Sequence, residues 1–164
     1  MKLILSLVFA VTLSLNATAG DGFDKLYSKY SATEGVTSIN LSESIIKIAS
    51  KFLSDEDQEA KEVLQDIESI KLLTSEGTTN TNLIKEAKAL LKSDGYEDLI
   101  RVNEGDEFVR IMVKESNEII KDIIVYVESK DEFVFINVTG DIDPEKVGKA
   151  LESLDIKVDG LDIN

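Results

Sequence analysis

Between residues 96 and 139 the chain alternates runs rich in Ile, Val, Phe and Tyr with short polar gaps. The runs cover residues 96–102, 107–114, 119–128 and 132–139, and Gly, Asn, Ser or Asp closes each of them. The gaps have the length of hairpin turns, so neighbouring strands are expected to run antiparallel. The pattern therefore predicts a four-stranded meander that forms the scaffold of the domain.

The remaining apolar positions predict two further strands and a set of helices. Two short runs predict the strands, at 36–41 and 67–75. Apolar residues at helical spacing predict the helices, over 23–30, 43–53, 54–66, 83–92 and 143–154. The fold class that follows is α+β: a mainly antiparallel sheet of about five or six strands with helices packed chiefly on one face. The expected order is β-α-α-β-α-β-β-β-β-α, in which the early β-α-β steps are compatible with right-handed parallel crossovers.

The two faces of the meander differ in polarity. Along 107–114 one side carries Val109, Ile111 and Val113, whereas the other carries Phe108, Arg110, Met112 and Lys114. The first side is expected to be core and the second to be partly wet. Apolar side chains left exposed on the second side would form an interaction surface. The candidate interaction face comprises Phe108, Met112, Ile120, Ile124 and Tyr126.

The N-terminus has the features of a secretory signal. Lys2 supplies a positive charge, residues 3–15 are largely apolar, and Ala17-Thr18-Ala19 places small residues before a cleavage site. We expect a signal peptide over 1–19, cut between Ala19 and Gly20. The apolar run is shorter than the ~20 residues that span a bilayer, and without Cys no lipid can be attached at a cysteine. The expected location is therefore periplasmic or secreted, with no stable membrane anchor after signal cleavage.

Length predicts a single α+β domain after the signal. Residues 20–164 suffice for one hydrophobic core, expected over about 24–154. The tail 155–164 alternates apolar and polar residues, as a weak edge strand or a frayed end would.

The charge balance narrows the class of partner. The 164 residues include 32 Asp and Glu against 18 Lys and Arg, a net charge of −14. Such a surface disfavours nucleic acid and anionic lipid, which both need basic contacts. Solubility is the ordinary explanation for much of this negative charge. The functional alternatives are that the surface binds a basic partner or holds divalent cations loosely.

The sequence offers no residues for most catalytic or metal chemistry. It contains neither His nor Cys, which excludes Ser-His-Asp and Cys-His triads, thiol redox centres and ordinary zinc sites. A calcium loop that began at Asp55 would need Gly at its sixth position, where Ala60 stands. Asp55, Glu56 and Asp57 are instead typical of the first turn of a helix. No catalytic, cofactor-binding or metal-binding residues and no cofactor are predicted.

Four segments, taken in order, resemble a known protein family. They are 30–39 (YSATEGVTSI), 70–74 (IKLLT), 96–102 (YEDLIRV) and 132–143 (EFVFINVTGDID). Together they are similar to the exported bacterial family called domain of unknown function 4252. The resemblance implies a Bacteroidetes-type envelope protein with one α+β domain. It implies no active-site residues, because the family has no assigned activity.

These observations favour an exported envelope protein that acts as a non-catalytic binding or protein-interaction module. Its partner would be an envelope protein or a small ligand. One alternative is a carboxylate-based hydrolase, which needs an acid of raised pKa beside an ionised partner. Another is an envelope-stress or regulatory component that binds a basic partner through the acidic surface. An enzyme predicts a deep pocket with two or more carboxylates, whereas a binding module predicts a shallow apolar patch.

Overall fold

The computed structural model of the chain describes residues 19–54, 58–77, 80–93 and 95–153. The predicted signal peptide up to residue 18, the acidic cluster at 55–57 and the predicted tail 155–164 lie outside the described residues. Within the described part, no helix combines the length and the apolar character needed to cross a lipid bilayer.

The described residues form one six-stranded sheet and five helices, which confirms the α+β class. The strands are β1 (Val36–Ser42), β2 (Ile67–Glu76), β3 (Glu97–Glu104), β4 (Glu107–Ser116), β5 (Ile119–Glu128) and β6 (Glu132–Ile142). The helices are α1 (Ala19–Tyr30), α2 (Glu43–Ser50), α3 (Gln58–Gln65), α4 (Thr81–Leu90) and α5 (Pro144–Ser153).

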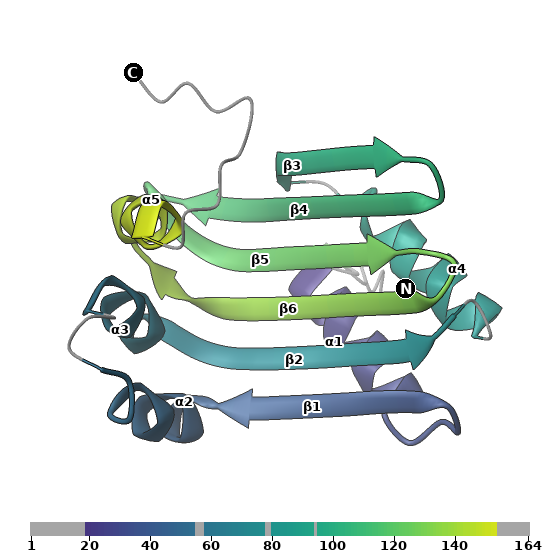
Figure 1. The fold of residues 1–164 in the computed structure, drawn as a ribbon, viewed down its shortest axis with the longest axis horizontal. Helices are drawn as coiled ribbons and strands as arrows, with labels where there is room; N and C mark the ends of the chain where they lie inside the picture. The colour runs from purple at the N-terminus through teal and green to yellow at the C-terminus, as the bar shows by residue number, and fades with distance from the viewer. Residues whose placement is uncertain (1–18, 55–57, 78–79, 94, 154–164) are drawn as a thin grey trace, which may run out of the picture.

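All neighbouring strands in the sheet are antiparallel. The spatial order is β1-β2-β6-β5-β4-β3 (Figure 1). The predicted meander therefore forms as expected over β3 to β6. The step from β1 through α2 and α3 to β2 is also antiparallel, so it is not a parallel crossover. The last strand, β6, joins the meander to the β1-β2 pair.

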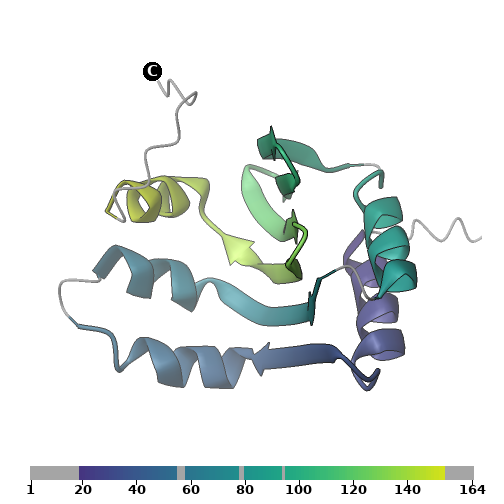
Figure 2. The ribbon, with the colours of Figure 1, turned by 45° about the vertical axis from the view of Figure 1, so that its right-hand side comes forward.

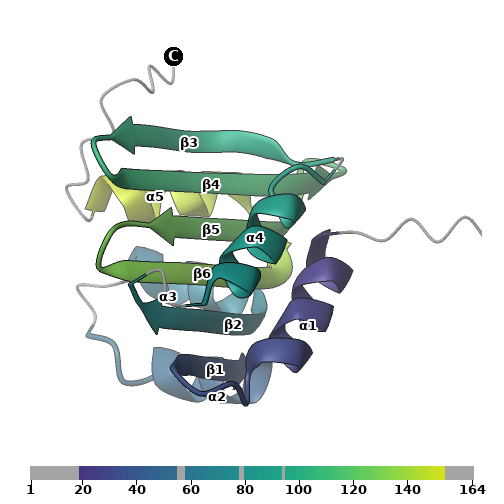
Figure 3. The same cartoon turned by 90° about the vertical axis from the view of Figure 1, so that its right-hand side faces the viewer.

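Helices α1 and α4 lie side by side against one face of the sheet (Figure 3). They bury an aromatic core, in which Tyr126 lies between Phe133 and Phe135 with ring centroids 5.6 Å and 5.8 Å away. An ion pair of 2.6 Å between Lys29 and Glu86 joins the two helices at the surface. The buried members of this cluster are Phe23, Leu26, Tyr30, Leu73, Leu83, Ile84, Ala87, Leu91, Met112, Ile124, Tyr126, Phe133 and Phe135.

Helices α2, α3 and α5 form a second group on the opposite face, at one end of the strands (Figures 1 and 2). Their apolar side chains Ile46, Val63, Leu64 and Val147 pack on a second cluster that includes Val113 and Ile142. The helices thus cover both faces, one of them only at its end, rather than chiefly one face. The rest of this second face carries no helix in the described part of the chain.

The N-termini of α2 and α5 lie at the positions that the sequence predicts, but their capping differs. Asp143 caps α5, because its carboxylate accepts a hydrogen bond of 2.9 Å from the backbone N–H of Glu145. Ser42 precedes α2, but its hydroxyl makes no capping hydrogen bond. Both helices begin where the sequence predicts, although only α5 has the side-chain cap.

Candidate interaction face

The candidate interaction face predicted from the sequence is wrong, since most of it lies in the core. Met112, Ile124 and Tyr126 are at most 1% exposed beneath α1 and α4. Phe108 is half-buried and packs edge-on against Tyr126, with ring centroids 5.7 Å apart. The side of the meander that carries Arg110 is therefore the covered side, because large aromatic side chains provide most of the apolar area available for burial.

Ile120 does not belong to that side at all. The strand register shifts between Lys114 and Glu115 on β4 and between Ile120 and Asp122 on β5. A bulge of this kind reverses the alternation of side chains along a strand. Ile120 consequently packs with Ile142 in the second cluster, under α2, α3 and α5.

The opposite face of the sheet carries aliphatic side chains in continuous rows. The register aligns one residue from each strand, so each row crosses the sheet. The isoleucine row comprises Ile39, Leu72, Ile136, Val125, Ile111 and Ile100. The valine row comprises Thr37, Thr74, Val134, Val127, Val109 and Val102. The helix-covered row comprises Leu41, Ile70, Val138, Ile123 and Val113, which pack against α2, α3 and α5.

The isoleucine row and the valine row together form what we call the open face. None of its residues belongs to either core cluster or packs against one. At the two sheet edges Ile39 is 44% and Val102 is 43% exposed, and the inner strands contribute half-buried side chains. With strands ~4.8 Å apart and rows ~7 Å apart, the open face covers on the order of 300–400 Å². Soluble monomers rarely leave a larger contiguous apolar patch uncovered, and such patches often bind partners.

A second exposed apolar feature lies on α2, directly after β1. Ile45 and Ile48 are 50% and 52% exposed, and Phe52 after the helix end is 84% exposed. Ile45 and Ile48 lie on the side of α2 that points away from the buried Ile46. None of the three belongs to the rows of the open face, so they provide a comparison for it.

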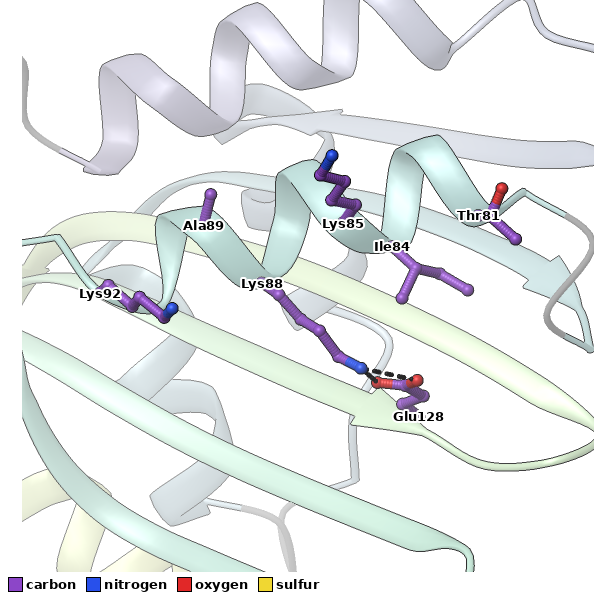
Figure 4. A pocket seen from close by; sticks show the side chains of 7 residues that line it. All are labelled: Thr81, Ile84, Lys85, Lys88, Ala89, Lys92 and Glu128. Atoms are coloured by element: carbon purple, nitrogen blue, oxygen red, sulfur yellow. Dashed lines mark hydrogen bonds and ion pairs between the residues drawn. The ribbon is translucent and has the colours of Figure 1, made fainter.

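A groove along α4 has a different chemistry (Figure 4). Lys85, Lys88 and Lys92 line it at helical spacing, together with Glu128 from β5. Lys88 pairs with Glu128 at 2.7 Å, and the hydroxyl of Tyr126 donates a hydrogen bond of 2.5 Å to the same carboxylate. Burial opposes ionisation of Glu128, yet the hydrogen bonds from Lys88 and Tyr126 hold its pKa below the usual range. The carboxylate therefore ties α4 to the sheet, which is a structural role.

The most deeply buried carboxylate in the described residues is Asp122. It is 7% exposed and accepts a hydrogen bond of 2.5 Å from the side-chain amide of Asn137. Burial raises the pKa of Asp122, while hydrogen bonds from Tyr96 and Asn137 work in the opposite direction. A raised pKa would suit a general acid, but Asp122 lines none of the three grooves along α4, near Gly35 and near Pro144. Among the described residues, no group of three or more acidic side chains is placed to hold a metal ion.

Replacement of Asp122 by asparagine is expected to stabilise the protein at neutral pH. Because the folded-state pKa lies above the ordinary value of 3.8, the native state holds more protons than the unfolded state in the window just above that value. Stability is therefore full below this window and falls as the pH rises through it. Urea unfolding at about pH 3 and about pH 7 checks this. The Asp122→Asn advantage should appear at the higher pH only, and a variant that is less stable at both would contradict it. Asp131→Asn is the control at an exposed position.

Comparison with known protein families identifies a match. A family model described as a domain of unknown function (DUF4252) matches residues 30–150. The matched segment runs from the end of α1 into α5 and so contains the whole sheet. No curated protein matches the chain, and no solved structure matches it either.

Proposed function

The chain belongs to the family of the domain of unknown function DUF4252, and on this premise we propose that it is an exported, non-catalytic protein-interaction module that binds its partner through the open face. The observation that carries this proposal is the pair of uncovered aliphatic rows that cross all six strands. The signal peptide predicted over residues 1–19 supports a periplasmic or secreted location.

The chemistry of the open face favours an apolar contact over catalysis. Apart from Thr37 and Thr74, its side chains are aliphatic and carry no group that donates, accepts or titrates. The sheet hydrogen bonds already pair the backbone of the inner strands. The face therefore gains free energy mainly by removal of its apolar area from water.

The shape of the open face favours a protein over a small ligand. Small molecules bind in concave pockets that enclose most of their surface. Three surface grooves lie along α4, at the strand ends near Gly35, and near Pro144. None of the three is lined by the isoleucine row, and the groove near Gly35 reaches the open face only at Thr37 and Thr74. A broad sheet face matches the apolar centre of a protein interface.

Threonine substitution in the isoleucine row tests the proposal. Ile111→Thr, Val125→Thr and Ile136→Thr, combined in one variant, keep β-branched side chains that favour strands and add a hydroxyl to each. The matched control combines Ile45→Thr, Ile48→Thr and Leu99→Thr, at apolar positions outside the open face. With loss of about 0.8 kcal/mol per buried methyl-sized group, affinity for the partner should fall about 30-fold or more.

Two measurements test this prediction, the first on the purified, processed protein and the second in the cells that produce it. Fluorescence of Nile red, a neutral apolar dye, should fall in the isoleucine-row variant and remain in the control. Crosslinking in the intact envelope, followed by mass spectrometry, should then yield a partner that the control keeps and the isoleucine-row variant loses. Equal dye binding and equal crosslinks for all three proteins would refute the proposal, provided that thermal unfolding shows each to be folded.

A further inference from the structure

The open face is bordered by acidic residues at the ends of its strands. Beyond the valine row, the same alternation places four glutamates on the same side of the sheet, and we call them the acidic row. The acidic row comprises Glu76, Glu132, Glu107 and Glu104. All four are exposed, and they lie at the end of the sheet that is opposite to α2, α3 and α5 (Figure 1).

The acidic row places like charges directly against each other. Glu104 pairs with Glu107 across the β3-β4 hairpin, and Glu76 pairs with Glu132 across β2 and β6. Like charges at opposed strand positions destabilise a sheet. This repulsion therefore destabilises the sheet in the isolated chain, and a cationic partner would relieve the repulsion.

Two lysines near this end of the sheet pair with carboxylates outside the acidic row. Lys130 pairs with Asp106 at 3.2 Å, and Lys88 pairs with Glu128 at 2.7 Å. Across the residues that the structure describes, no basic side chain forms an ion pair with Glu104, Glu107 or Glu132. These three carboxylates are the basis of the inference.

The open face thus lies between two unlike borders. One border is the helix-covered row with α2, α3 and α5 packed on it, and the other is the acidic row. The isoleucine and valine rows between them are ~7 Å apart, and a helix ~10 Å in diameter would cover both. A partner that lies across the strands would have an apolar underside and, along one flank, positive charge.

We propose that the open face binds an amphipathic helix of a partner protein, with the apolar side of the helix on the isoleucine and valine rows and a flank of Lys or Arg along the acidic row. This proposal rests on the function proposed above and names the class of partner. The six strands span ~24 Å from β1 to β3, so the helix needs about 16 residues at 1.5 Å per residue to cross them.

A helix fits this site better than the other protein surfaces that could cover it. An extended segment laid on the aliphatic rows would turn backbone groups toward side chains that cannot pair with them, whereas a helix pairs its own. A second copy of the chain would bring a net charge of −14 and a second acidic row. Charge therefore disfavours self-association and favours a basic partner.

Model peptides test this class of partner directly. One peptide of about 16 residues carries a leucine stripe with lysines along one flank, and its match carries glutamates in place of those lysines. Binding of both peptides to the purified, processed protein is measured by fluorescence anisotropy at low and high salt. The lysine peptide should bind at least tenfold more tightly than the glutamate peptide at low salt, with a smaller difference at high salt.

Two glutamine variants test whether the acidic row causes the preference for the lysine peptide. Glu104→Gln, Glu107→Gln and Glu132→Gln, combined, should weaken binding of the lysine peptide about tenfold. The control combines Glu59→Gln, Glu115→Gln and Glu145→Gln, which removes the same charge at exposed positions away from the open face. Its affinity should stay within about twofold of the unchanged protein.

The outcomes separate this inference from the function on which it rests. Equal binding of the two peptides, or equal losses in the two glutamine variants, would overturn the basic-helix inference. If the isoleucine-row variant still bound less Nile red than its control in that case, the open face would remain the proposed interaction site. Dimerisation in sedimentation experiments that increases when the acidic row is neutralised would likewise overturn the inference, because the natural occupant would then be a second copy.

Discussion

Replacement of Gly140 by alanine is expected to lower the free energy of unfolding by about 3 kcal/mol or more. Gly140 lies on β6 where the chain passes close to β2. A Cβ atom added there would stand 2.1 Å from the carbonyl oxygen of Asp66 and 3.0 Å from Cα of Ile67. Both are backbone atoms, so no side-chain rotation relieves the overlap. The movement would also disturb the hydrogen bond of 3.0 Å from the N–H of Asp141 to the carbonyl of Asp66.

Gly148 is the matched control for this experiment. It lies within α5, and a Cβ added there meets no atom within 4 Å. Gly148→Ala should stabilise the protein by about 0.5–1 kcal/mol, because alanine favours the helix and restricts the unfolded chain. Guanidinium unfolding of the two variants checks both signs at once. Similar stabilities for the two variants would show that β6 can move away from β2 at little cost.

Truncation of Tyr126 to alanine is expected to destabilise the protein by about 3–5 kcal/mol. The ring is fully buried and lies within 6 Å of the rings of Phe108, Phe133 and Phe135. Its removal would leave a cavity at the centre of the α1-α4 core and would remove three edge-on ring contacts. Thermal unfolding followed by circular dichroism measures the loss, which should be large enough to leave much of the variant unfolded at 37 °C.

Tyr126→Phe separates the ring from its hydroxyl. The ring contacts remain, and only the hydrogen bond to Glu128 is lost, while Lys88 still pairs with that carboxylate. The expected cost is about 1 kcal/mol. If the phenylalanine variant were as unstable as the alanine variant, the Tyr126–Glu128–Lys88 chain rather than the aromatic packing would hold α4 on the sheet.

The meander could be predicted from the sequence because its information is local. Each of its strands is an apolar run that ends at a turn signal, and three short hairpins fix their pairing. The position of β2 beside β6 depends on contacts between residues some 65 positions apart, such as Leu72 and Ile136. No local pattern encodes such a pairing, so the order of the strands had to come from the structure.

The sequence pattern places the candidate interaction face on the covered side of the sheet, and individual residues show why. Arg110 and Lys114 suggest a wet side, and we therefore expected exposure around Met112. In the structure Arg110 lies at the margin of the core, where it pairs with Asp98 at 2.5 Å and donates to the carbonyl of Leu91 at 2.8 Å. Its charge stays near the surface while its stem crosses apolar side chains. A charged residue on a strand thus marks the margin of a face and does not show which face is covered.

The acidic row could not be predicted from the sequence either. Glu104 and Glu107 flank a predicted hairpin, but Glu76 and Glu132 are 56 positions apart and meet only through the β2-β6 pairing. Thirty-two acidic residues make chance pairs common at any spacing. Only the register distinguishes the glutamates that border the open face from those that serve solubility.

The central place of β6 sets the order in which the domain can fold. Strands β1 and β2 are made early, yet β2 completes its hydrogen bonds only with β6, which ends at Ile142. The β1-β2 pair alone is a two-stranded unit, which is marginal in water. Cooperative closure of the sheet must therefore wait until β6 has been made. The proposed export requires the protein to cross a membrane before it folds. This delay would keep the chain unfolded while it crosses.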